Sequence, residues 1–266
     1  MGEDTAVPLV CVAGLEVAIF GAEAHPGAPV VFVTHGRGGV MAYVYGYCRD
    51  LVDLGFVAVA VEQRNHGRRL VNPEGNGGWS VHHAADMYGD AVGTAMDISL
   101  LIDMLPAHLG MAMHRIGMTG ISMGGHATLL AMTLDSRIHV GAPMIGSGDY
   151  RRLMELRAAA NGCPPEEFAN YYPPALQRAV EKFDPIHHAS RFADRPLLMT
   201  NGADDPLVQL ECNQRFASAA RPYYTDHDRL KLSAYPGIGH EVPPEMWIEA
   251  KMWLQRWLLE ENDALA

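Results

Sequence analysis

Short apolar runs alternate with longer amphipathic segments along most of the chain. The short runs are rich in valine, isoleucine and other apolar residues, which predicts buried β-strands. These expected strands cover 29–36, 55–63, 115–122, 139–147, 196–202 and 230–237. Two further runs, 8–14 and 15–23, meet at a glycine and predict an antiparallel pair.

The longer segments carry apolar residues near helical spacing, which predicts helices between the strands. These expected helices cover 41–54, 84–105, 123–134, 207–220 and 243–261. Pro106 is expected just beyond the end of the second helix, and Pro243 and Pro244 suit the first turn of the last one. Apolar strands that alternate with helices imply an α/β fold, with a mostly parallel sheet covered by helices on both faces.

Residues 148–195 break this alternation, because they contain no convincing strand. We expect a helical cap insertion there, placed before the strand that carries an acidic pair, within a single domain spanning 1–266. The insertion either lines a substrate pocket or buries a small core of its own. Both interpretations apply to its apolar and aromatic residues, Leu153, Leu156, Phe168, Tyr171 and Tyr172. The loop at 72–83, which contains Trp79, is a second candidate pocket wall.

Composition favours a globular protein and argues against nucleic-acid and metal binding. The 266 residues are 48% hydrophobic and 19% charged, as in ordinary globular domains. The formal net charge of −11 argues against a nucleic-acid partner, because such proteins gather lysine and arginine in clusters. The four cysteines are widely spaced with no C-x-x-C, and His82-His83 lacks a third ligand at a matching spacing, so no metal site is expected.

The N-terminal stretch has no basic region followed by a long apolar run, so we expect no signal peptide. No stretch looks apolar over the length that a membrane helix needs, so no membrane partner is expected either. These features, with unpaired cysteines, favour a cytoplasmic protein. A homodimer is left open.

Polar residues follow several expected strands where each one ends. Ligands of open α/β sheets bind beyond the carboxyl ends of the strands. The segment 35–39 follows the first buried strand, and Ser122 ends the strand at 115–122. The acidic pair Asp204-Asp205 and His240 follow the last two strands. A serine, an acid and a histidine therefore meet at one edge of the sheet.

These residue types suit nucleophilic catalysis. Serine needs a base within hydrogen-bond reach, and histidine can take its proton and return it. An acid at the other ring nitrogen fixes the tautomer. Gly120 and Gly124 allow a sharp strand-to-helix turn that presents Ser122 above the sheet. The backbone N–H groups of Met123 and Arg37 are the expected oxyanion donors.

The chain resembles the α/β-hydrolase superfamily over essentially its whole length, and within it the dienelactone-hydrolase-like and prolyl-oligopeptidase-like esterases. The motifs are H-G-R-G-G at 35–39, E-Q-R-N-H-G at 62–67, G-I-S-M-G at 120–124, G-A-D-D-P-L-V at 202–208 and G-I-G-H-E-V-P at 237–243. The resemblance implies an eight-stranded sheet, a Ser-Asp-His triad and no cofactor. Dienelactone hydrolases carry a cysteine where this chain has Ser122.

The family pattern G-x-x-D-x-x-V selects Asp205 as the triad acid, because Gly202 and Val208 flank it at the matching distances. Asp204 is then a loop-capping or solvent-facing carboxylate. Asp149 is an alternative acid, since some hydrolases use that strand end.

Several further residues have expected roles around the site. His35, Gly36 and Gly38 support the loop that holds the Arg37 N–H. The Arg37 side chain either contacts a substrate carboxylate or lies in solvent. We expect Arg64 and His66 to pin a neighbouring loop, and His126 to be packed in the helix that follows Ser122.

The expected activity is hydrolysis of small to medium, moderately hydrophobic carboxylic esters through an acyl-Ser122 intermediate. The partner is then a small-molecule ester. An amidase, peptidase or thioesterase with the same triad is the alternative. Peptidase activity is less favoured, because the sheet begins near residue 8 and leaves no room for an N-terminal propeller. A non-catalytic binding module is the third hypothesis.

Overall fold

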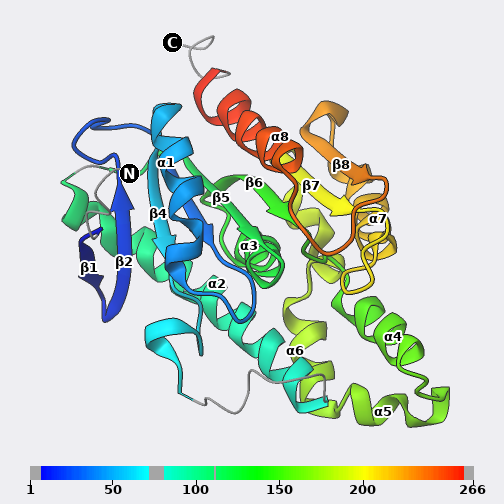
Figure 1. Cartoon of the computed structure of the whole chain (residues 1–266). Coiled ribbons are helices and arrows are strands. Elements are labelled where there is room, and N and C mark those ends of the chain that lie inside the picture. Colours follow the sequence, from blue (N-terminus) through cyan, green and yellow to red (C-terminus); the bar gives the residue numbers. More distant parts are fainter. Residues whose placement is uncertain (1–6, 72–80, 111, 261–266) are drawn as a thin grey trace.

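The computed structural model describes residues 7–71, 81–110 and 112–260. Its centre is one eight-stranded sheet of order β1-β2-β4-β3-β5-β6-β7-β8 (Figure 1). The strands are β1 (Leu9–Val12), β2 (Leu15–Phe20), β3 (Val30–Thr34), β4 (Val57–Val61), β5 (Ile116–Ile121), β6 (Ile138–Met144), β7 (Leu197–Gly202) and β8 (Leu230–Tyr235).

The hairpin β1–β2 is antiparallel, β2 pairs antiparallel with β4, and the remaining pairs are parallel. The expected α/β fold and antiparallel pair are confirmed. Since β3 and β4 are buried along their whole length, their sequences read as continuous apolar runs.

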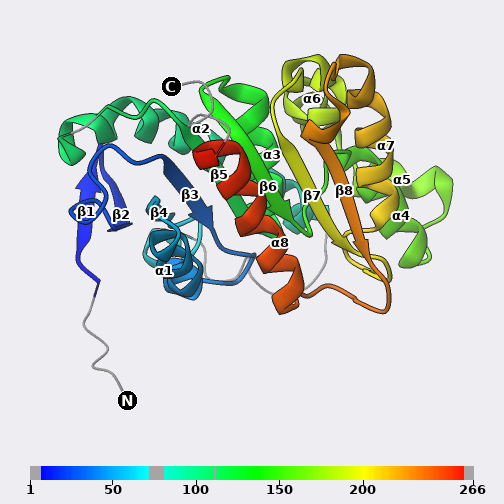
Figure 2. The ribbon, with the colours of Figure 1, turned by 90° about the horizontal axis from the view of Figure 1, so that it is seen from above.

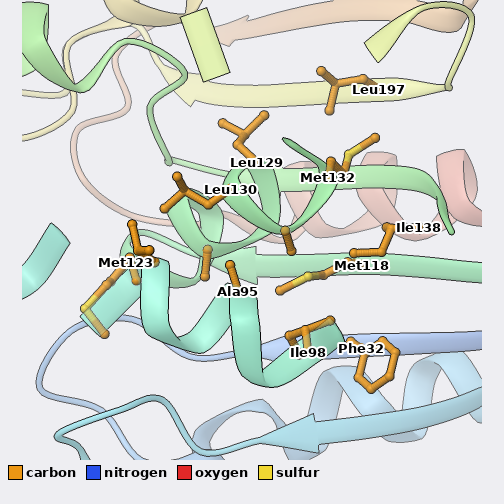
Figure 3. Close-up of a cluster of buried hydrophobic side chains, with 14 of the residues drawn as sticks. Phe32, Ala95, Ile98, Met118, Met123, Leu129, Leu130, Met132, Ile138 and Leu197 are labelled. Carbon is orange, nitrogen blue, oxygen red and sulfur yellow. The ribbon is translucent and has the colours of Figure 1, made fainter. Parts of the chain in front are cut away.

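Helices cover both faces of the sheet (Figure 2). The main ones are α1 (Tyr45–Asp53), α2 (Val81–Leu109), α3 (Met123–Leu134), α7 (Leu210–Ala220) and α8 (Pro244–Gln255). Side chains alternate along each strand, so Val30 and Phe32 face the core under α2 and α3, while Val31 and Val33 face α1 and α8. Figure 3 shows the first of these cores, with Ala95 and Ile98 of α2 beside side chains of α3 and the sheet.

Short helices complete the chain. The 3₁₀ helices that the described residues form outside the insertion are η1 (Met41–Val44), η2 (Gly67–Arg69), η6 (Arg221–Tyr223) and η7 (His227–Arg229). The last helix ends in a π-helical turn, η8 (Arg256–Glu260). Trp247 and Trp253 of α8 and Trp257 of η8 are all buried in the core. The expected helix at 243–261 is therefore α8 followed by η8.

The expected end of the second helix before Pro106 is wrong, because α2 continues through that proline to Leu109. An internal proline removes one hydrogen bond and crowds the preceding turn. Leu105 is fully buried and Leu109 packs against the same core. Burial of this last turn against the sheet thus outweighs the local cost.

The expectation that no stretch is apolar enough to cross a membrane is also corrected. Residues Ala85–Leu109 of α2 are long and apolar enough by length and composition, and half of that window is buried inside the protein. A core helix passes the same test, so the finding carries little weight by itself. Helix α2 packs against α3, and Ala95, Ile98 and Leu101 lie in the main core.

The segment 148–195 is helical, as the fold prediction requires, and it gathers at one side of the molecule (Figure 1). It contains α4 (Tyr150–Ala160), η4 (Pro165–Glu167), α5 (Phe168–Tyr171), α6 (Pro174–Phe183) and η5 (Pro185–Phe192). Leu153 and Tyr172 are buried in the main hydrophobic core, with Leu156 and Phe168 packed against it. Their packing favours a structural role over pocket lining. Of the candidate wall at 72–83, residues 72–80, with Trp79, lie outside the described part of the chain.

Candidate active site

Ser122 occupies a sharp turn between β5 and α3. Its backbone has φ 55° and ψ −112°, a conformation that non-glycine residues rarely adopt. Two glycines permit the turn: a Cβ on Gly120 would collide with Gly124, and one on Gly124 would collide with the carbonyl oxygen of Thr34. Donation from the Ser122 N–H to Met144 O, at 2.9 Å, ties the turn to β6. The strain is therefore held by close packing around the serine.

A chain of hydrogen bonds connects three strand ends. Ser122 Oγ lies 2.8 Å from His240 Nε2, and His240 Nδ1 lies 2.8 Å from Asp205 Oδ2. Asp205 is only 4% exposed, and its other oxygen accepts the N–H groups of Leu207 and Val208 at 2.8 and 2.9 Å. The structure thus brings together the serine, acid and histidine that the sequence separates.

The two competing acids are engaged elsewhere. Asp204 is exposed and accepts the Gly237 N–H at 2.9 Å, which is a loop-capping role. Asp149 is buried, caps α4 by accepting the Arg152 N–H at 3.0 Å, and pairs with Arg215 at 2.7 Å. Only Asp205 of these three acids hydrogen-bonds to His240 among the described contacts.

The glycine-rich loop after β3 passes beside the turn that holds Ser122. A Cβ placed on Gly36 would lie 3.6 Å from Ser122 Cβ, so this loop backbone packs directly against the serine. Gly38 has φ +72°, and the Gly39 N–H donates to Gly36 O at 3.1 Å, which closes a tight turn around Arg37. Met123 is the first residue of α3, where backbone N–H groups favour negative charge. Both candidate oxyanion donors therefore belong to segments in contact with Ser122.

His35 holds the loop at 35–39 in place through its ring nitrogens. The residue is 1% exposed, with Nδ1 2.8 Å from Gly36 O and Nε2 2.7 Å from Glu62 Oε1. Glu62 also accepts the Met41 N–H at 2.9 Å. These contacts brace the loop and leave His35 away from Ser122 Oγ.

The adjacent loop at 62–67 is pinned in a similar way. Arg64 donates two hydrogen bonds to Asp97, at 3.0 and 2.7 Å, and His66 Nδ1 lies 2.7 Å from Arg64 O. Burial lowers the pKa of His66, which favours its neutral form. Arg64 and His66 thus make the pinning contacts expected of them.

His126 is packed one turn into α3. It is 3% exposed, and its Nδ1 accepts the Ser147 N–H at 3.0 Å. Burial lowers the pKa of His126 to about 3, so the ring is neutral at pH 7. It supports the base of the site and does not reach Ser122 Oγ.

Sequence reasoning missed Arg157, which extends from cap helix α4 to the acid loop. Its Nε donates to Leu207 O at 2.6 Å, and the Leu207 N–H donates to Asp205. The residue is 7% exposed, and burial lowers the pKa of its guanidinium to about 10. Nothing in the local sequence identifies it, because the contact depends on how α4 lies against the loop at 205–208.

The described residues contain no group of three or more histidine, cysteine or acidic side chains that could hold a metal ion. The four cysteines are free thiols. The residues brought together at the site offer a hydroxyl, an imidazole, a carboxylate and backbone N–H groups.

Comparison with known proteins points to one group of hydrolases. A model of the prolyl oligopeptidase family matches residues 54–261. The chain is 26% identical over 242 residues to the Bacillus subtilis (strain 168) protein described as "Putative esterase YitV", covering 88% of this chain and 91% of that protein. It is 23% identical over 219 residues to esterase YjfP of Escherichia coli (strain K12), covering 76% and 82% of the two chains.

Solved structures share the fold. TT1662 from Thermus thermophilus matches with a TM-score of 0.76 at 22% identity, covering 95% of this chain and 97% of that one. A cold-adapted esterase from an Arctic intertidal metagenomic library matches with a TM-score of 0.63 at 19% identity, covering 94% and 92%.

Proposed function

Because the chain belongs to the prolyl oligopeptidase family, we propose that it is a serine carboxylic-ester hydrolase with Ser122 as its nucleophile. The proposal rests chiefly on one observation, the continuous hydrogen bonding from Ser122 through His240 to buried Asp205. Its esterase relatives support the ester as the bond that is cleaved. The proposed substrates are small to medium, moderately hydrophobic esters.

The first half of the proposed reaction forms an acyl-enzyme. Ser122 Oγ attacks the ester carbonyl while His240 Nε2 takes its proton. Asp205 at Nδ1 keeps the ring in the required tautomer and stabilises the imidazolium. The backbone N–H groups of Arg37 and Met123 stabilise the oxyanion of the tetrahedral intermediate. His240 then gives its proton to the leaving alcohol.

The second half releases the acid. His240 takes a proton from water, and the resulting hydroxide attacks the acyl carbonyl. Collapse of the second tetrahedral intermediate breaks the bond to Ser122 Oγ, which recovers its proton from His240. The same two backbone N–H groups serve both steps.

The deciding test is hydrolysis of p-nitrophenyl esters from acetate to laurate by the wild type and by Ser122→Ala. We expect the variant to lose turnover by about 10⁴-fold, since the nucleophile is gone and only binding and oxyanion stabilisation remain. Ser218→Ala is the matched control, because Ser218 is an exposed serine on α7 that donates only to Gln214 O among the described contacts. Wild-type turnover in Ser122→Ala would disprove the assignment.

Amide cleavage is the second candidate, favoured by the family match itself. Anilide and thioester probes with the same acyl group separate these activities. Faster cleavage of the anilide than of the ester would favour the amidase or peptidase function. Failure of an organophosphonate to label Ser122 would favour a binding function.

A further inference from the structure

The acid of the proposed triad depends on the acid loop, residues 205–208 after β7. One oxygen of Asp205, Oδ1, accepts the N–H groups of Leu207 and Val208 at 2.8 and 2.9 Å. The other oxygen, Oδ2, lies 2.8 Å from His240 Nδ1. The direction in which the carboxylate faces His240 therefore depends on where the backbone of the acid loop lies.

The peptide bond between Leu207 and Val208 is hydrogen-bonded at both ends. Its N–H donates to Asp205 Oδ1, and its carbonyl oxygen accepts the Nε–H of Arg157 at 2.6 Å. A trans peptide points its N–H and its C=O in opposite directions, so guanidinium, peptide and carboxylate follow one another in sequence. A donor at the carbonyl polarises the peptide and strengthens the hydrogen bond that its N–H makes. Arg157 and Asp205 are thus joined through a single peptide.

The acid loop is also held from β7 and α7, by two buried asparagines. Asn201 donates through Nδ2 to Val208 O at 2.8 Å, and Asn213 donates through Nδ2 to Asn201 Oδ1 at 2.9 Å. Both asparagines are at most 1% exposed. Among the hydrogen bonds of the described residues, that of Arg157 is the one that connects the cap helix α4 to this loop.

Arg157 is itself held in place by α4. The Asn161 N–H and side-chain amide donate to Arg157 O at 3.0 and 2.7 Å, which caps the end of the helix. The start of α4 is tied to α7 by the ion pair of Arg152 with Glu211 (Figure 1). Burial lowers the pKa of the Arg157 guanidinium to about 10 and the Asp205 carboxylate opposes that shift, so the group is charged at pH 7. A buried charge is costly to a fold unless an opposite charge compensates it.

We infer that Arg157 is a positioning residue for the proposed esterase reaction, acting on Asp205 through the peptide between Leu207 and Val208. The inference rests on the proposed function above. Asp205 Oδ2 stays directed at His240 Nδ1, and the buried positive charge stabilises the carboxylate that supports the imidazolium. The imidazolium forms as the reaction proceeds, so removal of Arg157 should lower kcat and leave KM unchanged.

Steady-state hydrolysis of p-nitrophenyl esters by Arg157→Met and Arg157→Lys tests this inference. Arg157→Met keeps the length of the side chain and removes its charge and donors. We expect kcat to fall by about 10- to 100-fold with KM within about twofold, because one charge-assisted hydrogen bond is lost. Arg157→Lys keeps a charge and an N–H donor and should recover most of that loss. Arg151→Met is the matched control, since Arg151 is an exposed arginine on the same helix that pairs with Glu155.

Proton NMR separates failure of this inference from failure of the proposed function, because it needs no turnover. A ring N–H that is strongly hydrogen-bonded to a carboxylate resonates downfield of ordinary N–H protons, and its absence in His240→Gln assigns it. We expect this resonance to move upfield in Arg157→Met and to keep its position in Arg157→Lys and Arg151→Met. If the wild type cleaves no ester while the resonance moves in this way, the proposed function fails and the positioning of Asp205 by Arg157 stands.

Wild-type kcat and an unmoved resonance in Arg157→Met would overturn the inference. A raised KM with wild-type kcat would also overturn it, and would make Arg157 a substrate-binding residue. An equal loss of kcat in Arg157→Met and Arg157→Lys, with both variants folded by circular dichroism, would reject the role of the charge. If Arg157→Met does not fold, Arg157→Gln is compared with Arg157→Lys in its place, because it keeps an N–H donor for the Leu207 carbonyl and lacks the charge.

Discussion

Ser122 shows how one strained residue depends on its neighbours. A non-glycine residue at φ 55° and ψ −112° costs about 1–3 kcal/mol. The cost is offset by the glycines of the turn and by the hydrogen bond to Met144 O. The result is a hydroxyl that points away from the sheet toward His240. The same turn therefore strains the Ser122 backbone and places the Ser122 hydroxyl beside His240.

The pair Asp204-Asp205 offers a test at this scale. Asp205→Asn should lower kcat for p-nitrophenyl acetate by about 10⁴-fold, because the amide donates to His240 Nδ1 and favours the wrong tautomer. Asp204→Asn should retain kcat within about twofold, since the contact of its carboxylate in the described part of the chain is with the Gly237 N–H. Steady-state kinetics of both variants measure the difference. A larger loss in Asp204→Asn than in Asp205→Asn would contradict the geometry.

Single residues were predictable where a motif fixes the spacing. The positions of Gly202 and Val208 select Asp205 over its neighbour, and the structure brings Asp205 to His240. Arg157 was not predictable, because its contact with Leu207 O joins segments far apart in the chain. Local sequence carries no information about such a contact. The proposed catalytic roles of these residues stay predictions until the kinetics are measured.

At the scale of elements, the close packing of α3 onto β3 limits the size of the side chains in the turn at Ser122. A Cβ on Gly124 would collide with the Thr34 carbonyl, which is backbone and cannot rotate away. We expect Gly124→Ala to lower the free energy of unfolding by about 1–3 kcal/mol. Urea denaturation followed by circular dichroism measures it.

Gly89 is the matched control for this substitution. It lies inside α2, and a Cβ there would meet nothing within 4 Å. Gly89→Ala should raise the free energy of unfolding by roughly 0.5–1 kcal/mol, because alanine favours the helix. If both variants shift stability in the same direction, the steric account of the turn is wrong.

The cap is tied to the sheet layer through the start of α4. Asp149 caps this helix and pairs with Arg215 of α7, and Arg152 pairs with Glu211 of the same helix at 2.7 Å. We expect Asp149→Ala to lose about 2 kcal/mol of stability, and Asp149→Asn to recover about 1 of it, because asparagine retains the cap. Both should keep kcat within about twofold. A 10³-fold loss of kcat in Asp149→Asn would instead support Asp149 as the catalytic acid.

Elements were predicted well where burial makes the sequence pattern continuous. The expected strands all correspond to strands of the sheet, because each is covered on both faces or pairs along an edge. The end of α2 was predicted wrongly, because burial of side chains such as Leu105 outweighs the local cost of Pro106 in the helix. The switch from α8 to a π-helical turn at Arg256 has no counterpart in the apolar pattern.

At the scale of the whole molecule, the order of strands cannot be read from local patterns. Alternating strands and helices predicted a parallel sheet, but the placement of β3 between β4 and β5 depends on long-range packing. The number of strands was predictable, since the apolar pattern and the resemblance to the α/β-hydrolase superfamily both indicate eight.

Global stability should depend on pH through Asp184. This carboxyl is fully buried, its Oδ2 accepts the Tyr150 N–H at 2.8 Å, and its Oδ1 has no partner among the described residues. Burial raises the pKa of Asp184 well above its usual range. The folded state therefore holds a proton that the unfolded state releases above about pH 3.9, so the wild type loses stability as pH rises from there.

Asp184→Asn removes this titration. The difference in free energy of unfolding, variant minus wild type, should increase by up to about 1.4 kcal/mol per pH unit above pH 4. Urea denaturation at several pH values between 4 and 8 measures the gap. A gap that shrank with rising pH for Asp184→Asn would reverse the sign and contradict the buried, protonated carboxyl.

Ser122 and His240 lie 118 residues apart, and the histidine follows the carboxyl end of β8. Consider a partly folded chain in which the central strands have paired and β7 and β8 have not yet joined the sheet. In such a chain His240 is not yet beside Ser122. The hydrogen bond between Ser122 and His240 therefore forms only when the sheet is complete. Under the proposed function, an incompletely folded copy would not hydrolyse esters, and the esterase activity of a preparation would be proportional to its amount of correctly folded protein.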